Sequence, residues 1–355
     1  MTRYLRFIAI IIASRGLLAF FLSGLDLVAV WREVRGGHSG LLFLTLVTTA
    51  SLYVVRTWRW QVLLRPIGRA RFGNALRATI IGFGLSAMLP ARPGEVVRPY
   101  VLARREGFNT AATFSTIVVE RLLDLVTVLL LFGGFLTLSD PGLERADPRV
   151  FEAVKIGAAV SAVGALVAVW LVFLIAGRPE VLDRILRPLV RILPRRAAEL
   201  VNGLAEKVSS GFAVVRQPAV LAGALVLSVV HWVMVAFCVW TAVSAFRLAV
   251  PFTGSFLLLG LLVVGVSVPT PGAVGGFHAA LQIGLTAFYA ALPDKAAAAA
   301  IVLHAISFVP VALVSLVLFI PEGMTIAVMR RAASEDVLPG APAILNGGRH
   351  DGGPS

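Results

Sequence analysis

A short polar stretch, LPARPGEVVR, interrupts the apolar sequence at residues 89–98. Arg92 and Arg98 flank Glu95 there, and a guanidinium is the side chain best shaped to bind a phosphate or carboxylate through two hydrogen bonds. The pattern therefore predicts an anion clamp made by Arg92 and Arg98. The alternative is that both are ordinary arginines near the cytoplasmic membrane surface. Glu95 either neutralises one of them or lies in the first turn of a helix, where a negative charge is favourable.

A second charged group lies in VVERLLDL, residues 118–125. Glu120 and Asp124 are four residues apart and share one face of a helix, and Arg121 is close enough to reach Asp124. A charge at the centre of a bilayer costs about 2.5 to 3.5 kcal/mol on insertion scales, so these side chains must face partners or water. A structural ion network and a direct role in proton transfer or substrate binding both account for the pattern.

A third stretch, VPTPGAVGGFH at residues 268–278, is rich in residues that interrupt helices. Non-helical backbone within a membrane persists only where it is buried in protein or lines a wet cavity. Pro271, Gly272 and Gly276 therefore indicate a binding site. His278 follows them, and we expect it to donate a hydrogen bond to a head group or to relay a proton.

A helix is expected to restart after each interruption, near Gly94 and near Gly275. The N-terminus of a helix presents free N–H groups and the positive end of the helix dipole, which suit a phosphate or carboxylate. The three stretches together predict a substrate-binding site. Its expected residues are Arg92, Gly94, Glu95, Arg98, Glu120, Arg121, Asp124, Pro271, Gly272, Gly276 and His278.

Other kinds of site find no support in the sequence. The single cysteine, Cys238, allows no disulfide within the chain and no CxxC metal site. His231 and His304 are isolated, and both are expected to be hydrogen-bonded inside the bundle. No metal-binding spacing, nucleotide-binding loop or serine-hydrolase motif occurs in a suitable context. We therefore expect no metal, no other cofactor and no catalytic residue.

The composition is that of an integral membrane protein. Apolar residues make up 58% of the chain and charged residues 14%, with a mean hydropathy of +0.89. Several apolar runs approach or exceed the roughly 20 residues that a helix needs to cross a bilayer. The net charge of +13 comes from arginines beside these runs. Anionic lipid surfaces therefore explain the charge better than nucleic acid does.

The apolar runs predict an all-α fold, a polytopic transmembrane helical bundle with about six full spans and two re-entrant helical hairpins. The expected spans cover residues 7–23, 40–63, 109–136, 151–177, 219–246 and 296–320. The expected hairpins cover residues 74–104 and 252–292, each broken in the middle by Pro and Gly.

The arginine-rich connections at 56–77 and 178–216 mark the cytoplasmic side, whereas the slightly acidic connection 139–149 suits the outer side. The first hairpin then enters from inside and the second from outside, so that their tips point at each other. The two halves, about 7–136 and 151–320, form an inverted repeat of the kind that builds a midplane site in transporters. Both termini are expected in the cytoplasm.

Three further segments complete the expected organisation. The stretch RTWRW, residues 56–60, is interpreted as an Arg and Trp anchor at the inner membrane interface. Residues 178–217 are expected to form a cytoplasmic insert of amphipathic helices on the inner leaflet. One transmembrane domain would then cover residues 1–331, followed by a disordered tail at 332–355.

The sequence resembles the membrane region of the lysylphosphatidylglycerol synthase family, which is flippase-like. The resemblance covers nearly the whole chain as far as Arg331. It rests on RTWRWQVLLRPIG, GFGLSAMLPARPGEVVRPYVLARREG, VVERLLDL and PTPGAVGGFHAAL. It implies a stand-alone member without the aminoacyl-transferase domain. His278 is a departure, because family members often carry Glu after the second tip.

The resemblance implies a lipid translocase rather than an enzyme, one that moves or accommodates lipids with polar heads across the bacterial inner membrane. An anionic phospholipid and an isoprenoid or hopanoid type of lipid are the expected substrates. The alternatives are a membrane-embedded transferase, with Glu120 or Asp124 as general base, and a non-catalytic partner in envelope lipid biosynthesis. Membrane lipids are the expected partners, nucleic acid is not, and a homo-oligomer is left open.

Overall fold

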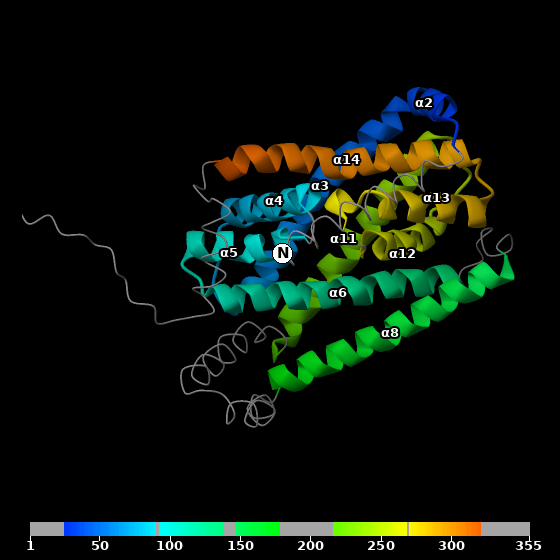
Figure 1. The fold of residues 1–355 in the computed structure, drawn as a ribbon. Coiled ribbons are helices and arrows are strands. Elements are labelled where there is room, and N and C mark those ends of the chain that lie inside the picture. The colour runs from blue at the N-terminus through cyan, green and yellow to red at the C-terminus, as the bar shows by residue number, and fades with distance from the viewer. Residues whose placement is uncertain (1–24, 90–91, 138–146, 178–215, 268–269, 321–355) are drawn as a thin grey trace, which may run out of the picture.

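The computed structural model describes residues 25–89, 92–137, 147–177, 216–267 and 270–320. Within these ranges the chain forms ten α-helices and one 3₁₀ helix and contains no strand, so the all-helical prediction is confirmed there. The helices lie side by side in a bundle, most of them along one common direction (Figure 1).

Five long helices form the frame of the bundle. They are α3 (Ser39–Leu64), α6 (Thr110–Thr137), α8 (Pro148–Gly177), α11 (Pro218–Ala245) and α14 (Pro293–Phe319). Among the described residues, α3, α11 and α14 are long and apolar enough to cross a membrane. Proline begins α11 and α14, where its fixed φ suits the first turn and its missing N–H costs nothing.

Two shorter helical hairpins lie end to end within this frame (Figure 1). The first is α4 (Phe72–Met88) followed by α5 (Gly94–Glu106). The second is α12 (Gly254–Ser267), the 3₁₀ turn η2 (Pro271–Ala273) and α13 (Gly276–Tyr289). Their tips meet, because Arg92 Nη2 donates a hydrogen bond to the Val266 carbonyl over 2.6 Å. The expectation that the two tips face each other therefore matches the observed geometry.

The first hairpin is closed by glycines. A Cβ on Gly94 would overlap the backbone carbonyl of Gly82, and a Cβ on Gly82 would lie 2.7 Å from the Cβ of Arg98. The Gly94 N–H also donates to Ser86 Oγ over 3.1 Å, which satisfies one of the free N–H groups at the start of α5. Small residues thus let α4 and α5 approach closely enough to bring both ends of the tip together.

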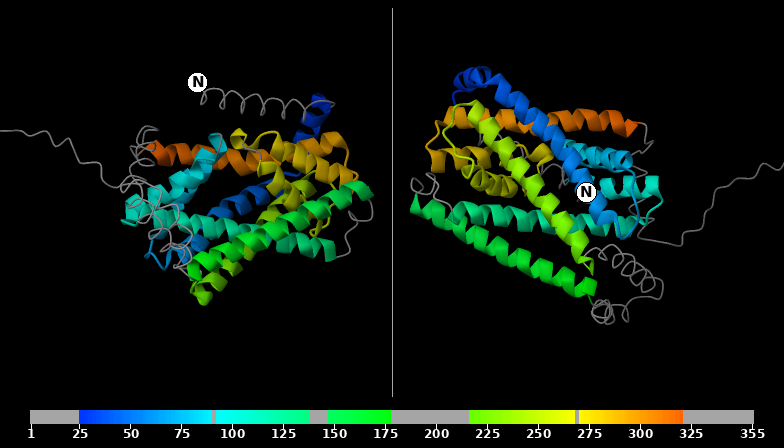
Figure 2. Two further views of the ribbon diagram at one scale, coloured as in Figure 1. Left: turned by 60° about the horizontal axis from the view of Figure 1, so that its bottom comes forward. Right: turned by 180° about the vertical axis from the view of Figure 1, so that it is seen from behind.

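The pair α3 and α11 runs along the other side of the bundle (Figure 2, right). Polar side chains join these two helices: the hydroxyls of Thr45 and Thr241 lie 2.8 Å apart, and Thr49 donates to Cys238 Sγ over 3.7 Å. Such contacts replace the hydrophobic driving force that is missing between helices in lipid. They hold α3, which carries Arg56 and Arg59, against α11, which carries His231 and Trp232.

The helix boundaries agree with the sequence-based ranges to within three residues wherever the two can be compared. One helix was not predicted, α2 (Leu27–Gly36), whose N-terminus is capped by the Asp26 carboxylate. The expected first span at 7–23, nearly all of the amphipathic insert at 178–217 and the tail at 332–355 lie outside the described residues.

The glycine contact predicts a sharp difference between two alanine substitutions. Gly94→Ala should lower the free energy of unfolding by about 1 to 3 kcal/mol, because the new Cβ meets backbone that cannot move aside. Gly133→Ala in α6 meets nothing within 4 Å and should be neutral or slightly stabilising. Thermal unfolding of both variants in detergent measures the difference, and equal unfolding temperatures would contradict the close approach.

Candidate functional site

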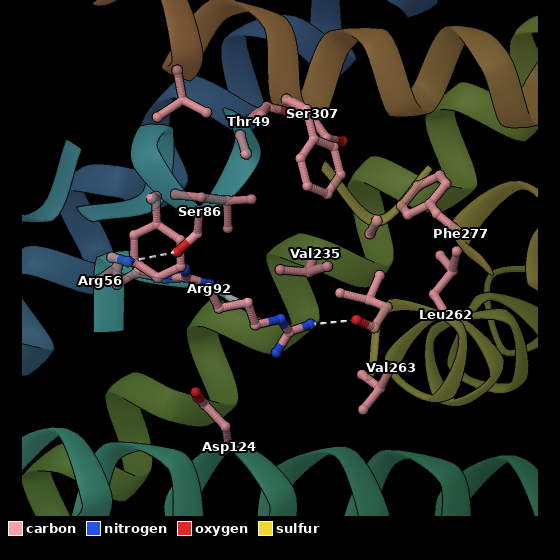
Figure 3. Close-up of a pocket in the computed structure, with 18 of the residues that line it drawn as sticks. Thr49, Arg56, Ser86, Arg92, Asp124, Val235, Leu262, Val263, Phe277 and Ser307 are labelled. Carbon is pink, nitrogen blue, oxygen red and sulfur yellow. Dashed lines mark hydrogen bonds between the residues drawn. The ribbon is translucent and has the colours of Figure 1, made fainter. Parts of the chain in front are cut away.

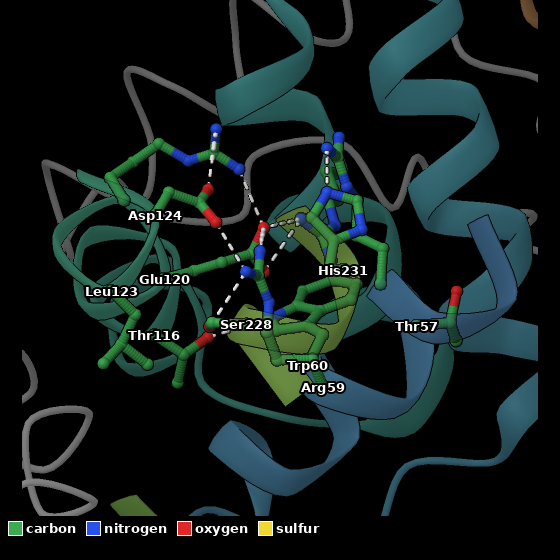
Figure 4. Close-up of polar contacts among 12 residues, drawn as sticks. Thr57, Arg59, Trp60, Thr116, Glu120, Leu123, Asp124, Ser228 and His231 are labelled. Atoms are coloured by element: carbon green, nitrogen blue, oxygen red, sulfur yellow. Dashed lines mark hydrogen bonds and ion pairs between the residues drawn. The ribbon is translucent and has the colours of Figure 1, made fainter. Parts of the chain in front are cut away.

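One buried carboxylate receives three arginines from three helices. Glu120 on α6 is 0% exposed. Its Oε1 lies 2.9 Å from Arg98 Nη1, 2.7 Å from Arg121 Nη2 and 3.1 Å from Arg59 Nη2. Arg98 comes from α5 and Arg59 from α3, so the contacts join three helices at one point (Figure 4).

The second carboxylate, Asp124, lies one helical turn further along α6. Its Oδ1 accepts hydrogen bonds from Arg59 Nη1 and, over 2.8 Å, from Trp232 Nε1 on α11. Arg121 Nη1 is 3.3 Å from Oδ2, and Arg59 also donates to Ser228 Oγ over 3.0 Å. The cluster therefore extends to a fourth helix, and both carboxylates are held by charge-assisted hydrogen bonds, the stronger class.

Aromatic rings cover the positive side of this cluster. The Arg98 guanidinium carbon lies 3.9 Å from the centre of the Trp60 ring, a cation–π arrangement that is stronger when both groups are desolvated. The Trp60 indole N–H in turn donates to Thr116 Oγ1 over 3.0 Å. Arg98 is 2% exposed and Trp60 fully buried. Arg98 is thus enclosed by a carboxylate on one side and an indole on the other.

Arg59 is the cluster residue that the sequence interpretation missed. The stretch 56–60 was interpreted as an interfacial anchor, and this is wrong for Arg59, which is 0% exposed inside the bundle. Trp58, by contrast, is 51% exposed on the opposite face. Helical spacing was the available signal, since Arg56, Arg59 and Trp60 are three and four residues apart and therefore share a face.

A cavity of about 430 Å³ opens beside the cluster, between the two hairpin tips. The first hairpin contributes Ser86, Arg92, Glu95 and Arg98 to its wall, and the second contributes Thr270, Ala273 and Phe277, with other apolar residues of α12. The rest of the wall comes from α3, α6, α11 and α14 (Figure 3). The meeting of the two tips therefore leaves a hollow, with charged groups set in a mostly apolar wall.

The two arginines of the predicted clamp, Arg92 and Arg98, lie in different surroundings. Arg92 lies at the tip with a positive φ of 50°, and its guanidinium extends into the cavity (Figure 3). Arg98 also borders the cavity, but its guanidinium is paired with Glu120. Arg92 is accordingly the more available cation, and Arg98 contributes mainly to the ion cluster.

Arg56 of α3 is a second cation in the cavity wall. Its Nη2 donates to His231 Nε2 over 2.8 Å, and its guanidinium carbon lies 4.0 Å from the centre of the Phe83 ring. Because arginine has only donors, His231 accepts at Nε2 and is the neutral imidazole. Arg56 was not among the residues predicted to bind substrate, apart from its place in the anchor motif.

At the second tip, His278 does not lie where we expected it, beside a bound head group. Gly272 has a φ of +59°, which favours glycine, and its carbonyl accepts a hydrogen bond from His304 Nε2 over 2.7 Å. His278 does not line the cavity. Its ring lies 4.5 Å from that of His304, and its Nδ1 accepts from the Gly275 N–H over 3.4 Å. Pro271 and Gly276 shape the tip without reaching the cavity wall.

Groups of three or more His, Cys, Asp or Glu that could hold a metal ion are absent from the described ranges. The charged centre is instead a pairing of arginines with carboxylates. Arginine carries no lone pair for a metal, and its fork of N–H donors suits anions such as phosphate.

Comparison with known proteins places the chain in a family. The family model described as the lysylphosphatidylglycerol synthase TM region matches residues 6–315. The chain belongs to this family. The resemblance predicted from the sequence is confirmed, and this member of the lysylphosphatidylglycerol synthase TM family is a multi-pass membrane protein.

A curated relative is Glycosyltransferase AglD of Haloferax volcanii, which is 28% identical over 291 residues. The match covers 74% of this chain and 46% of the relative. The chain thus spans less than half the length of that curated relative.

The shared carboxylate predicts a large loss of stability in one variant. Glu120→Gln removes the charge that pairs with three guanidiniums, two of them buried, and breaking a buried ion pair by removing one partner costs about 3 to 5 kcal/mol. The matched control is Glu152→Gln on α8, whose side chain is 60% exposed and paired with Lys155. It should cost less than about 1 kcal/mol. Thermal unfolding in detergent distinguishes them, and a small effect at Glu120 would contradict the structural importance of the cluster.

Proposed function

We propose that this protein is a lipid translocase that moves lipids with anionic head groups between the leaflets of the inner membrane. The observation that supports this most directly is the cavity between the hairpin tips, where guanidiniums are set in a mostly apolar wall. An anionic head group would be held there by Arg92, while its tails stay in the surrounding lipid. A translocation path needs such a polar site at depth, because a head group crossing hydrocarbon without partners pays the full cost of desolvation.

The proposed membrane arrangement is six spans with two re-entrant hairpins in an inverted repeat, and with both termini in the cytoplasm. The outer ends of α4 and α5 lie at the same end of the bundle as the C-termini of α3 and α14, and the outer ends of α12 and α13 lie at the opposite end (Figure 1). Arginines concentrate at the first of these ends, which the positive-inside rule assigns to the cytoplasm. Alternating access would then expose the cavity first to one leaflet and then to the other.

A membrane-embedded transferase is the second candidate, favoured by the name of one relative, Glycosyltransferase AglD. A general base needs a carboxylate that is free to take a proton from its substrate. Glu120 and Asp124 are instead both held by arginines. We therefore prefer transport, and we place the carboxylates in the support of the site rather than in chemistry.

The translocase proposal predicts that Arg92→Gln slows lipid transfer by about tenfold or more, because it removes a charge-assisted hydrogen bond of about 1.5 to 3 kcal/mol. Transfer of fluorescent phosphatidylglycerol between leaflets of proteoliposomes measures the rate. Arg92 is a better position than Arg98 for this test, because Arg98 also holds Glu120 and its loss would disturb the fold.

The matched control is Arg104→Gln, which removes an exposed arginine from the last turn of α5, outside the cavity. It should leave the transfer rate unchanged. Equal rates in wild type and Arg92→Gln would reject Arg92 as the head-group ligand. Equal slowing in both variants would indicate an effect of surface charge rather than of the cavity.

The proposed topology predicts which exposed positions are labelled from the same side of the membrane. Single cysteines introduced at Gly73 and Arg104 should react with an impermeant thiol reagent from the cytoplasmic side, and cysteines at Ala249 and Leu292 from the outer side. The native Cys238 is buried and should stay unlabelled in the parent protein. Labelling of Gly73→Cys and Arg104→Cys from opposite sides would mean that the first hairpin crosses the membrane completely.

A further inference from the structure

The charged groups around the cavity do not balance. Five arginines lie in the wall or directly behind it, namely Arg56, Arg59, Arg92, Arg98 and Arg121. Three carboxylates accompany them, namely Glu95, Glu120 and Asp124. His231 adds no charge, because its Nε2 accepts from Arg56. Within the described part of the chain, the site thus carries an excess of two positive charges.

Within the described residues, two of the five arginines form no ion pair with a carboxylate. Arg59, Arg98 and Arg121 each lie within 3.1 Å of a carboxylate oxygen of Glu120. In the described residues, by contrast, no ion pair joins Arg56 or Arg92 to a carboxylate. Arg56 contacts a neutral imidazole and the Phe83 ring. Arg92 donates to the Val266 carbonyl, and Glu95 attracts it without forming an ion pair.

Arg56 and Arg92 both line the same cavity but come from different elements, α3 and the tip of the first hairpin (Figure 3). An uncompensated charge inside a membrane protein is costly and is normally paired. A ligand that neutralises the site's excess of two positive charges must bring two negative charges into one space.

The size of the cavity limits what that ligand is. A volume of about 430 Å³ lies near the lower end of the roughly 300 to 1,000 Å³ that ligand pockets span. This is room for a compact phosphate head but not for the acyl tails of a lipid. Ser86 adds a hydroxyl to the wall; its oxygen accepts from the Gly94 N–H, which leaves its own O–H able to donate.

We infer that the head group bound in this cavity is a phosphate with two negative charges, a phosphomonoester or a diphosphate, carried by a lipid. The inference rests on the proposed function, because it names the substrate class of the same site. An ordinary phosphodiester lipid such as phosphatidylglycerol carries one negative charge and leaves one of the two guanidiniums uncompensated. A head group with an added amino acid cation would leave more.

The test compares three lipids with identical oleoyl tails, so that only the head-group charge varies. Purified full-length protein in detergent at pH 8.5 is titrated with dioleoylglycerol diphosphate, dioleoyl phosphatidic acid and dioleoyl phosphatidylglycerol. Dissociation constants are measured by microscale thermophoresis. Phosphatidylglycerol should bind at least tenfold more weakly than either of the other two lipids. Equal binding of all three by the wild-type protein overturns the inference without reference to any variant.

Substitutions then assign the preference to the two arginines. Arg56→Gln and Arg92→Gln should each weaken binding of the diphosphate lipid about tenfold, and the double variant should bind all three lipids alike. Arg104→Gln should keep the wild-type order. A double variant that still prefers the diphosphate lipid tenfold would overturn the assignment to these side chains.

Inorganic diphosphate distinguishes a lipid from a free anion. It should compete at least a hundredfold more weakly than the diphosphate lipid, because it lacks the tails. Competition as strong as that of the lipid would mean that the site takes a free phosphate compound, which overturns the lipid assignment. Binding is measured here without transport. Preferential binding without lipid transfer would therefore reject the translocase alone, and transfer of phosphatidylglycerol with no binding preference would reject this inference alone.

Discussion

The carboxylate of Glu120 is the point on which the rest of the structure depends. It lies within an apolar bundle, and its Oε1 receives Arg59, Arg98 and Arg121 from α3, α5 and α6. Burying these charges is unfavourable unless all partners are in place at once. The arrangement therefore stabilises one relative position of the three helices and penalises others, and this fixes the first hairpin against the frame.

The cavity is a consequence of that fixed position. The close contact of Gly82 with Gly94 makes the first hairpin narrow, and the Arg92 contact with Val266 sets its tip against the second hairpin. Helices that end inside the bundle leave space where a continuous helix would fill it. The hollow between the tips is thus produced by the interruptions in two helices rather than by movement of the frame.

The sequence predicted the helices and the meeting of the tips well, because long apolar runs, arginine distribution and Pro or Gly interruptions are local signals. It predicted the charged residues of α6 but not their partner Arg59, since an arginine beside tryptophans also fits a membrane interface. It paired Arg98 with Arg92 and did not predict that Arg98 would also contact Glu120. Spacing along the chain shows which residues share a helix face, but not which other helix that face will meet, and the same limit applies to His278 and its neighbour His304.

The distance along the chain between Arg59 and its partners has a consequence for biosynthesis. Asp124 follows Arg59 by 65 residues, so α3 is synthesised well before the carboxylates that neutralise it. At about 5 to 20 residues per second, the arginine waits for roughly 3 to 13 seconds. Arg59 lies near the C-terminal end of α3, where a long side chain can reach the aqueous interface during that interval. The burial of this arginine is therefore a late step, completed only when α6 arrives beside α3.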